Sequence, residues 1–191
     1  MTSTIIVYYS AAGTTEKLAH AVCAGASEVG SATIFRINGD EIIAGRFKNV
    51  AIWDALDKAD AIIFGSPTYM GGPAAQFKAF ADASSDRWSD KKWVDKVASG
   101  FTVGSNLNGD QSATLTYFNV FAAQHGMLWC GLDLHGGDDR LGRNRLGTQL
   151  GLTTDCLNDH VAELDLVTAH YLGRRVAQMA ARLSVRPHLK D

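Results

Sequence analysis

Apolar runs that alternate with helical patterns constrain this chain more than any other feature. The runs occupy residues 4–9 (TIIVYY), 31–37 (SATIFRI), 60–67 (DAIIFGSP), 96–104 (KVASGFTVG) and 127–134 (MLWCGLDL). Most of them lack the polar alternation of a strand with one solvated face, which indicates strands that are covered on both faces. We therefore expect a sheet that lies between two layers of helices.

Helical spacing of apolar residues fills most of the intervals between these runs. It predicts helices over about 15–29, from Pro73 onward, over 112–124 and over 161–183. Residues 38–60 are weakly patterned, with a candidate helix in IWDALDKAD, and a long glycine-rich loop is expected up to about His160. Such alternation predicts a doubly wound α/β fold with a five-stranded parallel sheet, right-handed crossovers and helices on both faces. The 191 residues suit one domain, 1–191.

Composition excludes several classes of function. The net charge of −2 gives no reason to expect a nucleic acid or a membrane surface as partner. No apolar run reaches membrane-spanning length, and no secretory signal is visible. The cysteines Cys23, Cys130 and Cys156 are far apart and odd in number, which indicates reduced thiols and a cytoplasmic protein. No C-x-x-C or H-x-x-x-H spacing occurs, so we expect no metal site.

The loop after the first strand has the character of an anion site. It consists of Ser10, Ala11, Ala12, Gly13, Thr14 and Thr15 and carries no charge. A loop between a strand and a helix N-terminus presents unpaired N–H groups and the positive end of the helix dipole, which suits a phosphate monoester. The nucleoside triphosphate loop and the G-x-G-x-x-G fingerprint are both absent. The alternative is an ordinary helix N-cap made by a Ser or Thr hydroxyl.

Two further loops follow the third and fourth strands. SPTYMGGP (66–73) offers flat or soft apolar surface from Tyr69 and Met70, as an isoalloxazine ring requires, although an ordinary glycine–proline turn has the same composition. GSNLNGD (104–110) offers N–H donors that suit the pyrimidine edge of such a ring. In a sheet of order 2-1-3-4-5 the loops after strands one, three and four converge where the strand order reverses, and ligands bind there.

Together these segments resemble a known family. YYSAAGTTEKLAHAVCAGA, DAIIFGSPTYMGGPAAQFKAFAD, KVASGFT, QHGMLWCGL and ELDLVTAHYLGRRVAQMA cover most of the chain. They are similar to the flavodoxin-like flavoproteins, and most closely to the WrbA-type FMN-dependent NAD(P)H:quinone oxidoreductases. The resemblance implies that FMN is the cofactor, that NAD(P)H is the electron donor and that a small-molecule quinone is the acceptor. It also implies a homodimer or homotetramer.

The same resemblance assigns the site residues. It places the FMN phosphate on the first loop, residues Ser10 to Thr15. It places the ring against Pro67, Thr68, Tyr69, Met70 and Gly71, and against Thr102, Val103, Gly104, Ser105, Asn106, Leu107, Asn108 and Gly109. His125 matches a histidine over the flavin where quinone binds, and Trp88 matches an aromatic residue that closes the same pocket across a subunit interface.

The expected mechanism is a ping-pong exchange in which His125 donates a hydrogen bond to the developing quinolate oxygen. Each assignment has an alternative. His125 also suits a helix C-terminus, Trp88 and Trp93 suit a core or an interface, and the arginines Arg140, Arg143 and Arg145 suit either a 2′-phosphate or a solvated loop. The rival functions are a flavodoxin-type one-electron carrier, a flavin-free response-regulator-like switch, and a protein that binds FMN chiefly to contact a regulator.

Overall fold

The computed structural model describes residues 1–156 and 160–184 and contains the expected doubly wound sheet. Its strands follow the order β2 (Ser31–Arg36), β1 (Ser3–Tyr8), β5 (Ala61–Tyr69) and β7 (Val97–Gly104), and then β8 (Leu128–Trp129) and β9 (Leu152–Asp155) share the edge beside β7. All of these pairings are parallel. The predicted order 2-1-3-4-5 is confirmed, with β8 and β9 together in the fifth position.

The fifth strand is not the continuous run 127–134 that the apolar pattern predicts. β8 pairs only with Val97 and Ala98 at the start of β7, and β9 pairs with Phe101 to Gly104 at its end. Between them the chain leaves the edge of the sheet and pairs with a later part of the same segment. Leu132 N–H donates to the Gln149 carbonyl (2.8 Å), and the two backbones are so close that a Cβ on Gly131 would lie 2.3 Å from that oxygen. The segment 130–151 is thus an insertion within the edge strand. The long loop expected up to about residue 160 contains β9, and residues 157–159 lie outside the described part.

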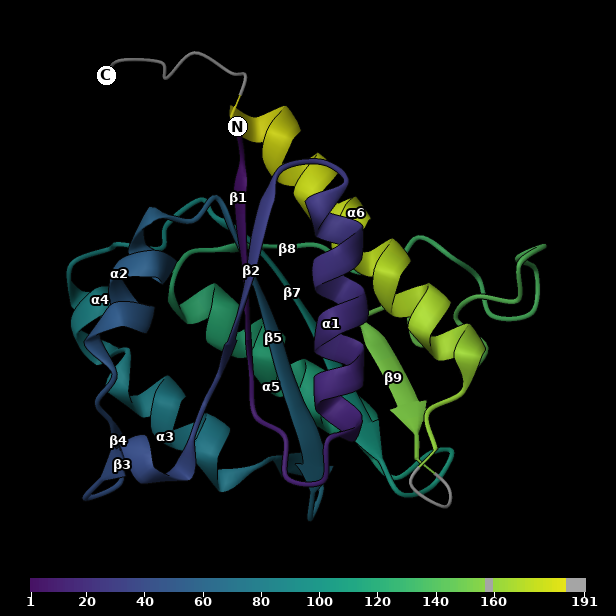
Figure 1. Cartoon of the computed structure of the whole chain (residues 1–191), viewed down its shortest axis with the longest axis horizontal. Helices are drawn as coiled ribbons and strands as arrows, with labels where there is room; N and C mark the ends of the chain where they lie inside the picture. The colour runs from purple at the N-terminus through teal and green to yellow at the C-terminus, as the bar shows by residue number, and fades with distance from the viewer. Residues whose placement is uncertain (157–159, 185–191) are drawn as a thin grey trace.

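Helices cover both faces of the sheet (Figure 1). α1 (Thr14–Ser27) and α6 (Glu163–Ser184) lie side by side on one face, where Leu18, Val22, Leu172 and Val176 are buried in one apolar cluster. α2 (Val50–Lys58), α3 (Ala75–Ala83) and α5 (Gln111–Gln124) supply the cluster on the other face, and the short α4 (Ser85–Ser89) follows α3. The weakly patterned stretch before α2 forms a one-turn η1 (Gly39–Glu41) and a small hairpin of β3 (Ile42–Ile43) and β4 (Arg46–Phe47).

Local hydrogen bonding shifts two predicted boundaries. β5 continues to Tyr69, past the predicted end at residue 67, because Thr68 and Tyr69 pair with β6 (Gly72–Pro73) in an antiparallel hairpin. The helix expected from Pro73 therefore begins at Ala75. The single-domain prediction for 1–191 stays a prediction, and residues 185–191 lie outside the described part.

Candidate functional site

The loops after β1, β5 and β7 meet at one edge of the sheet. Tyr8 at the end of β1 pairs with Gly65, and Pro67 in β5 pairs with Val103 in β7. Because these strands are parallel and in register, their carboxyl ends lie next to one another, at the lower edge of the sheet in Figure 1. The structure thus brings together the three segments in which the sequence placed the cofactor-binding residues.

The first loop leaves the N-terminus of α1 open. Gly13 is the N-cap residue with a φ of 88°, no side chain caps the helix, and a Cβ added at Gly13 would meet nothing within 4 Å. Ser10 is buried, and its Oγ accepts from the Gly13 N–H (3.1 Å). The alternative in which a Ser or Thr hydroxyl of this loop caps α1 is therefore wrong. No side chain caps the first-turn N–H groups of α1, and they lie at the positive end of the helix dipole, which suits a phosphate.

A charged pair that the loop sequence does not show lies beside this cradle. Arg36 Nη2 donates to the Ser10 carbonyl (2.8 Å), and Arg36 Nη1 lies 3.6 Å from Glu16 Oε2. The Tyr8 hydroxyl donates to Glu16 Oε1 (3.0 Å), and burial together with that carboxylate raises the pKa of Tyr8 to about 12. Sequence reasoning missed Arg36, because only the strand register places it directly opposite Tyr8 and beside the first loop. The cradle is therefore not supported by neutral groups alone, although Glu16 offsets the charge of Arg36.

The second loop is a tight hairpin turn that displays apolar surface. Met70 (φ 49°) and Gly71 (φ 78°) are its central residues, and two positive φ values are typical of a type I′ turn. Tyr69 is half exposed and Met70 fully exposed, whereas Pro67 is buried. The Thr68 hydroxyl is 2.8 Å from both Thr102 Oγ1 and Thr114 Oγ1, which ties this turn to β7 and α5. The fixed turn thus holds a flat aromatic side chain and a flexible thioether at the site.

The third loop begins at the buried end of β7 and continues as an exposed segment, which we call its crest. Thr102, Val103 and Gly104 are buried in β7, and the six residues from Ser105 to Asp110 are exposed. Gln111, the first residue of α5, is 1% exposed, and its Nε2 donates to the Asn106 carbonyl (2.9 Å). Gln111 therefore fixes the shape of the loop, a role that sequence reasoning missed because glutamine is common on helix surfaces.

His125 and Trp88 lie near each other but not at this edge. α5 runs from the third loop back along the sheet, and the Gly126 carbonyl after it accepts from Asp95 N–H (3.0 Å), two residues before β7 begins. The length of β7, roughly 23 Å at ~3.3 Å per residue, separates His125 from the third loop. His125, Trp88 and Ser84 line a hollow of ≈ 210 Å³ at the opposite edge. Within one chain, these two predicted site residues are therefore not beside the predicted cofactor loops.

His125 is a buried, neutral imidazole. Ser84 Oγ donates to the Ala81 carbonyl (2.7 Å), so the contact between Ser84 Oγ and His125 Nε2 (2.9 Å) requires His125 to donate from Nε2. Nδ1 then carries a lone pair, and it has no hydrogen-bond partner among the described residues. Burial lowers the pKa of His125 to about 4. The ring lies 4.3 Å from that of Trp93, so neither a charged helix-end imidazole nor a proton on Nδ1 fits this environment.

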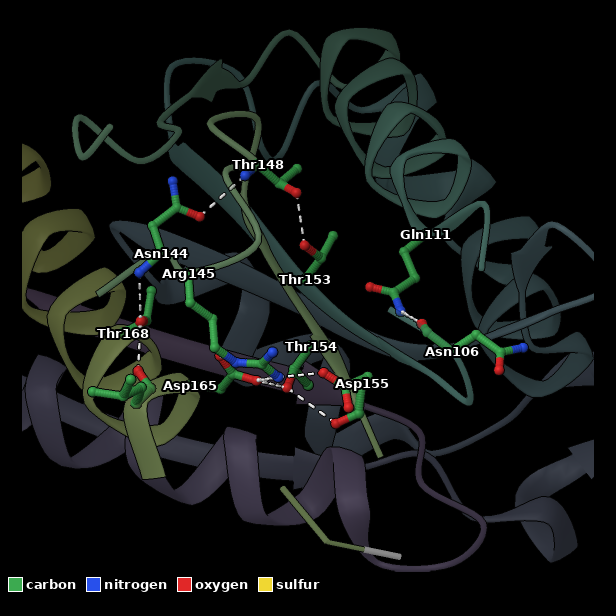
Figure 2. Close-up of polar contacts among 11 residues, drawn as sticks. Asn106, Gln111, Asn144, Arg145, Thr148, Thr153, Thr154, Asp155, Asp165 and Thr168 are labelled. Carbon is green, nitrogen blue, oxygen red and sulfur yellow. Dashed lines mark hydrogen bonds and ion pairs between the residues drawn. The ribbon is translucent and has the colours of Figure 1, made fainter. Parts of the chain in front are cut away.

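Packing decides the alternatives for Trp93, Arg143 and Arg145, whereas the roles of Trp88 and of the exposed Arg140 stay predictions. Trp93 is fully buried in the core, whereas Trp88 is 54% exposed. Arg143 donates from Nε and Nη2 to Asp139 and lies 4.2 Å from the Tyr171 ring centroid. Arg145 donates to both Asp155 and Asp165 (Figure 2). Arg143 and Arg145 therefore hold the insertion against β9 and α6, so they are not available to a 2′-phosphate.

Two kinds of feature, a metal-binding cluster and a membrane-spanning helix, are absent from the part of the chain that the structure describes. Residues 1–156 and 160–184 contain no group of three or more His, Cys, Asp or Glu side chains that could hold a metal ion. Over the same residues, no helix has the length and apolar character needed to span a bilayer.

Comparison with known proteins adds independent information. The family model described as NADPH-dependent FMN reductase matches residues 9–131. A protein from Pseudomonas aeruginosa named flavodoxin FldP is 36% identical, over 96% of this chain and 99% of that protein. A Geobacter sulfurreducens protein named NAD(P)H dehydrogenase (quinone) is 32% identical, over 94% of this chain and 98% of its own length. The crystal structure of a flavodoxin, WrbA-like protein from Agrobacterium tumefaciens superposes with a TM-score of 0.76 at 41% identity, over 95% of this chain and 99% of that one.

Proposed function

Because the chain belongs to the NADPH-dependent FMN reductase family, we propose that its three carboxyl-edge loops hold FMN while NAD(P)H and a quinone react in turn. The chain is a WrbA-type, flavodoxin-like flavoprotein and an NAD(P)H dehydrogenase (quinone). Its cofactor is FMN, its electron donor is NAD(P)H, and quinones are its class of acceptor. The ping-pong order and the roles of individual residues are the parts that we propose.

One observation carries the assignment of the phosphate site. The N-terminus of α1 has no side-chain cap, and the space beside Gly13 is open. A phosphate monoester placed there accepts hydrogen bonds from the first-turn N–H groups and lies at the positive end of the helix dipole. Thr14 and Thr15 follow directly in the chain, and Ser10 and Arg36 hold the loop in shape. The residues present therefore fit the phosphate of FMN.

The other two loops fit the ring. FMN, when bound, supplies the hydride chemistry that side chains lack. Tyr69 and Met70 offer an apolar wall on a turn that Thr68 anchors to β7 and α5. The exposed crest from Ser105 to Gly109 offers backbone N–H donors to the polar edge of the ring. We propose that these donors stabilise the negative charge of the reduced cofactor, which favours transfer of two electrons.

His125 and Trp88 enter this proposal only through a second subunit. The opposite edge of the sheet carries both residues, so they reach a flavin only if a neighbouring chain packs that edge against the loops. In the tautomer that Ser84 selects, the free acceptor of His125 is the buried Nδ1, so a quinone reaches it only if neighbouring side chains move aside. We therefore propose that His125 accepts a hydrogen bond from a hydroxyl of the reduced quinone, and that Trp88 packs against its ring. This role requires the expected homodimer or homotetramer.

A flavodoxin-type carrier is the second candidate, since one relative that matches nearly the whole chain is named a flavodoxin. A carrier passes single electrons between protein partners, whereas the proposed enzyme passes electron pairs between small molecules. Redox titration of the bound flavin separates the two. One two-electron step supports the enzyme, and two well-separated one-electron potentials support the carrier.

The decisive experiment uses FMN-loaded protein under anaerobic conditions. Addition of NADH or NADPH is expected to bleach the flavin absorbance, and a quinone added afterwards is expected to restore it. Initial rates measured at several concentrations of both substrates then give parallel double-reciprocal lines if the order is ping-pong. Absence of bleaching with either nucleotide would contradict the enzyme function, and converging lines would contradict only the ping-pong order.

A further inference from the structure

A polar hollow lies behind the third loop, and Leu107 and Asn108 are the members of its lining that the sequence also assigned to FMN. It has a volume of ≈ 520 Å³, within the range of about 300–1,000 Å³ for small-molecule sites. The crest of the third loop (Leu107, Asn108) and the first turn of α5 (Gln111, Ser112) form one wall, and Leu146 to Leu150 with Thr153 form the other. The insertion within the edge strand therefore creates the second wall.

One buried atom in the wall of this hollow lacks a partner. Gln111 Oε1 has no hydrogen-bond partner among the described residues, although the side chain is 1% exposed. Its orientation is fixed, because Nε2 must face the Asn106 carbonyl, and an exchange of the two amide atoms would set two acceptors 2.9 Å apart. Figure 2 shows this oxygen pointing across the gap toward the segment with Thr148 and Thr153. A buried acceptor without a partner is costly, so a ligand with an N–H or O–H donor is favoured here.

The lining restricts the chemistry of that ligand. Among the described residues, none of those that line the hollow carries a formal charge. Phosphate and carboxylate groups are therefore not expected inside it. The nearby guanidinium groups of Arg143 and Arg145 are bound to Asp139, Asp155 and Asp165. The ligand group is thus neutral and donates hydrogen bonds.

These restrictions show which reactant of the proposed function can occupy the hollow. The inference therefore rests on that proposed function. A quinone carries only acceptors, so it does not satisfy Gln111 Oε1. NAD(P)H carries donors at its nicotinamide amide and at its adenosine. The nicotinamide must lie against the flavin to transfer hydride, and Tyr69 and Met70, the proposed ring wall, do not line the hollow. The same observation excludes the flavin ring of FMN, whose N3–H is also a donor, so the adenosine end of the nucleotide remains.

We propose that the hollow between α5 and residues 146–153 binds the adenosine group of NAD(P)H, with Gln111 reading the adenine amino group. Oε1 accepts from the amino group, and the second Nε2 hydrogen is directed to a ring nitrogen, the pairing that glutamine makes with adenine elsewhere. Thr148 flanks the same space with a hydroxyl. The hollow thus confers specificity for the electron donor. The contacts that we propose between the three loops and FMN stay as described above.

The first test blocks the hollow without touching Gln111. Ser112 is exposed on α5, so Ser112→Phe fills the space from the helix side, and Ser112→Ala is the matched control that leaves it open. FMN-loaded full-length protein is titrated with adenosine by calorimetry. Saturable binding to the wild type and to Ser112→Ala, with at least a tenfold loss in Ser112→Phe, is expected. No adenosine binding to the wild type, or equal binding to both variants, would overturn the proposal.

The second test compares donors with and without the adenosine group. Reduced nicotinamide mononucleotide carries the hydride but lacks adenosine. Ser112→Phe is expected to weaken NADH about tenfold in anaerobic flavin reduction and to leave the mononucleotide within twofold. Equal weakening of both would overturn the adenosine assignment while the enzyme function stands. No reduction by either donor in the wild type would overturn the proposed function and, with it, the assignment of the hollow to the donor.

The third test examines Gln111 itself. Purine riboside is adenosine without the amino group, so the wild type is expected to prefer adenosine about fivefold, the order of one neutral hydrogen bond. Gln111→Met is expected to abolish that preference, while the matched Gln76→Met on α3 retains it. FMN affinity of each variant serves as the check on the third loop. A preference that survives in Gln111→Met, or that is absent from the wild type, would remove Gln111 from recognition.

Discussion

Arg145 and Asp165 form a two-pronged ion pair that holds the insertion to α6. Arg145 Nε and Nη2 donate to the two carboxylate oxygens of Asp165 at 2.9 and 2.8 Å, and Nη2 also donates to Asp155 at the end of β9. Asp165 is 1% exposed and accepts from Thr154 as well. The segment that forms one wall of the polar hollow is thus attached to β9 and α6 by ion pairs whose carboxylates are buried.

Removal of one member of this pair is expected to destabilise the fold. Asp165→Ala leaves the partly buried Arg145 guanidinium with Asp155 as its remaining carboxylate partner among the described residues, and the expected loss is about 3 kcal/mol of unfolding free energy. Urea denaturation provides the measurement. Asp133→Ala removes an exposed partner of Arg175 and is the control, with an expected loss below about 1 kcal/mol. Equal losses in the two variants would contradict the structural role of the buried pair.

The contact between α1 and α6 depends on glycine. A Cβ at Gly173 would lie 1.9 Å from the Val22 carbonyl oxygen, and one at Gly25 would lie 1.8 Å from the His170 carbonyl oxygen. Gly173→Ala is therefore expected to force the helices apart and to cost about 2–3 kcal/mol in thermal or urea unfolding. Gly39→Ala, where an added Cβ meets nothing within 4 Å, is the control. Gly173→Ala with wild-type stability would show that the two helices are not closely packed.

Gly13→Ala tests the phosphate cradle against a matched backbone change. Gly13 (φ 88°) and Gly45 (φ 76°) both have positive φ values and open space around an added Cβ, so alanine at either position is expected to cost about 1–2 kcal/mol of stability. Only Gly13 borders the proposed phosphate site. We expect Gly13→Ala to weaken FMN at least tenfold in fluorescence titration and Gly45→Ala to leave FMN affinity near wild type. Similar FMN affinities in the two variants would place the phosphate elsewhere.

Burial of His125 makes stability depend on pH in a defined window. Its pKa is lowered from 6.5 to about 4, so between these values the unfolded chain binds a proton that the folded chain does not. Stability from this group is complete above pH 6.5 and is lost as the pH falls toward 4, with about 2 kcal/mol lost between pH 7 and pH 5. Urea unfolding of His125→Gln at both pH values is expected to lack this component. The exposed His20 gives the control variant, His20→Gln.

The proposed role of His125 makes a separate prediction about turnover. His125→Ala is expected to lower quinone reduction about tenfold or more and to leave FMN affinity and anaerobic reduction by NADH near wild type, since the flavin loops lie at the opposite edge of the same chain. Steady-state rates with a quinone, beside single-turnover reduction by NADH, separate the two half-reactions. Unchanged quinone turnover would remove His125 from the mechanism. A monomer in sedimentation measurements would do the same, because no second chain would then reach the flavin.

The sequence alone determined the layered fold and the edge of the sheet at which the three proposed cofactor loops meet. Continuous apolar strands such as 4–9 and 60–67 need cover on both faces, and parallel strands bring the loops of Ser10–Thr15, 67–71 and 102–109 to one edge. Both conclusions depend on short-range pattern, which a sequence records directly.

Only the tertiary structure decided which polar side chains act together. The polar strand LTTD at 152–155 has no apolar pattern, so its place beside β7 depends on register with distant residues. Arg36 reaches the first loop through its pairing opposite Tyr8, and Gln111 is buried because its side chain packs against Gly104 and the third loop. His125 lies at the far edge because α5 runs antiparallel to the strands. Contacts between segments remote in the chain arise from packing, and residue spacing alone does not encode them.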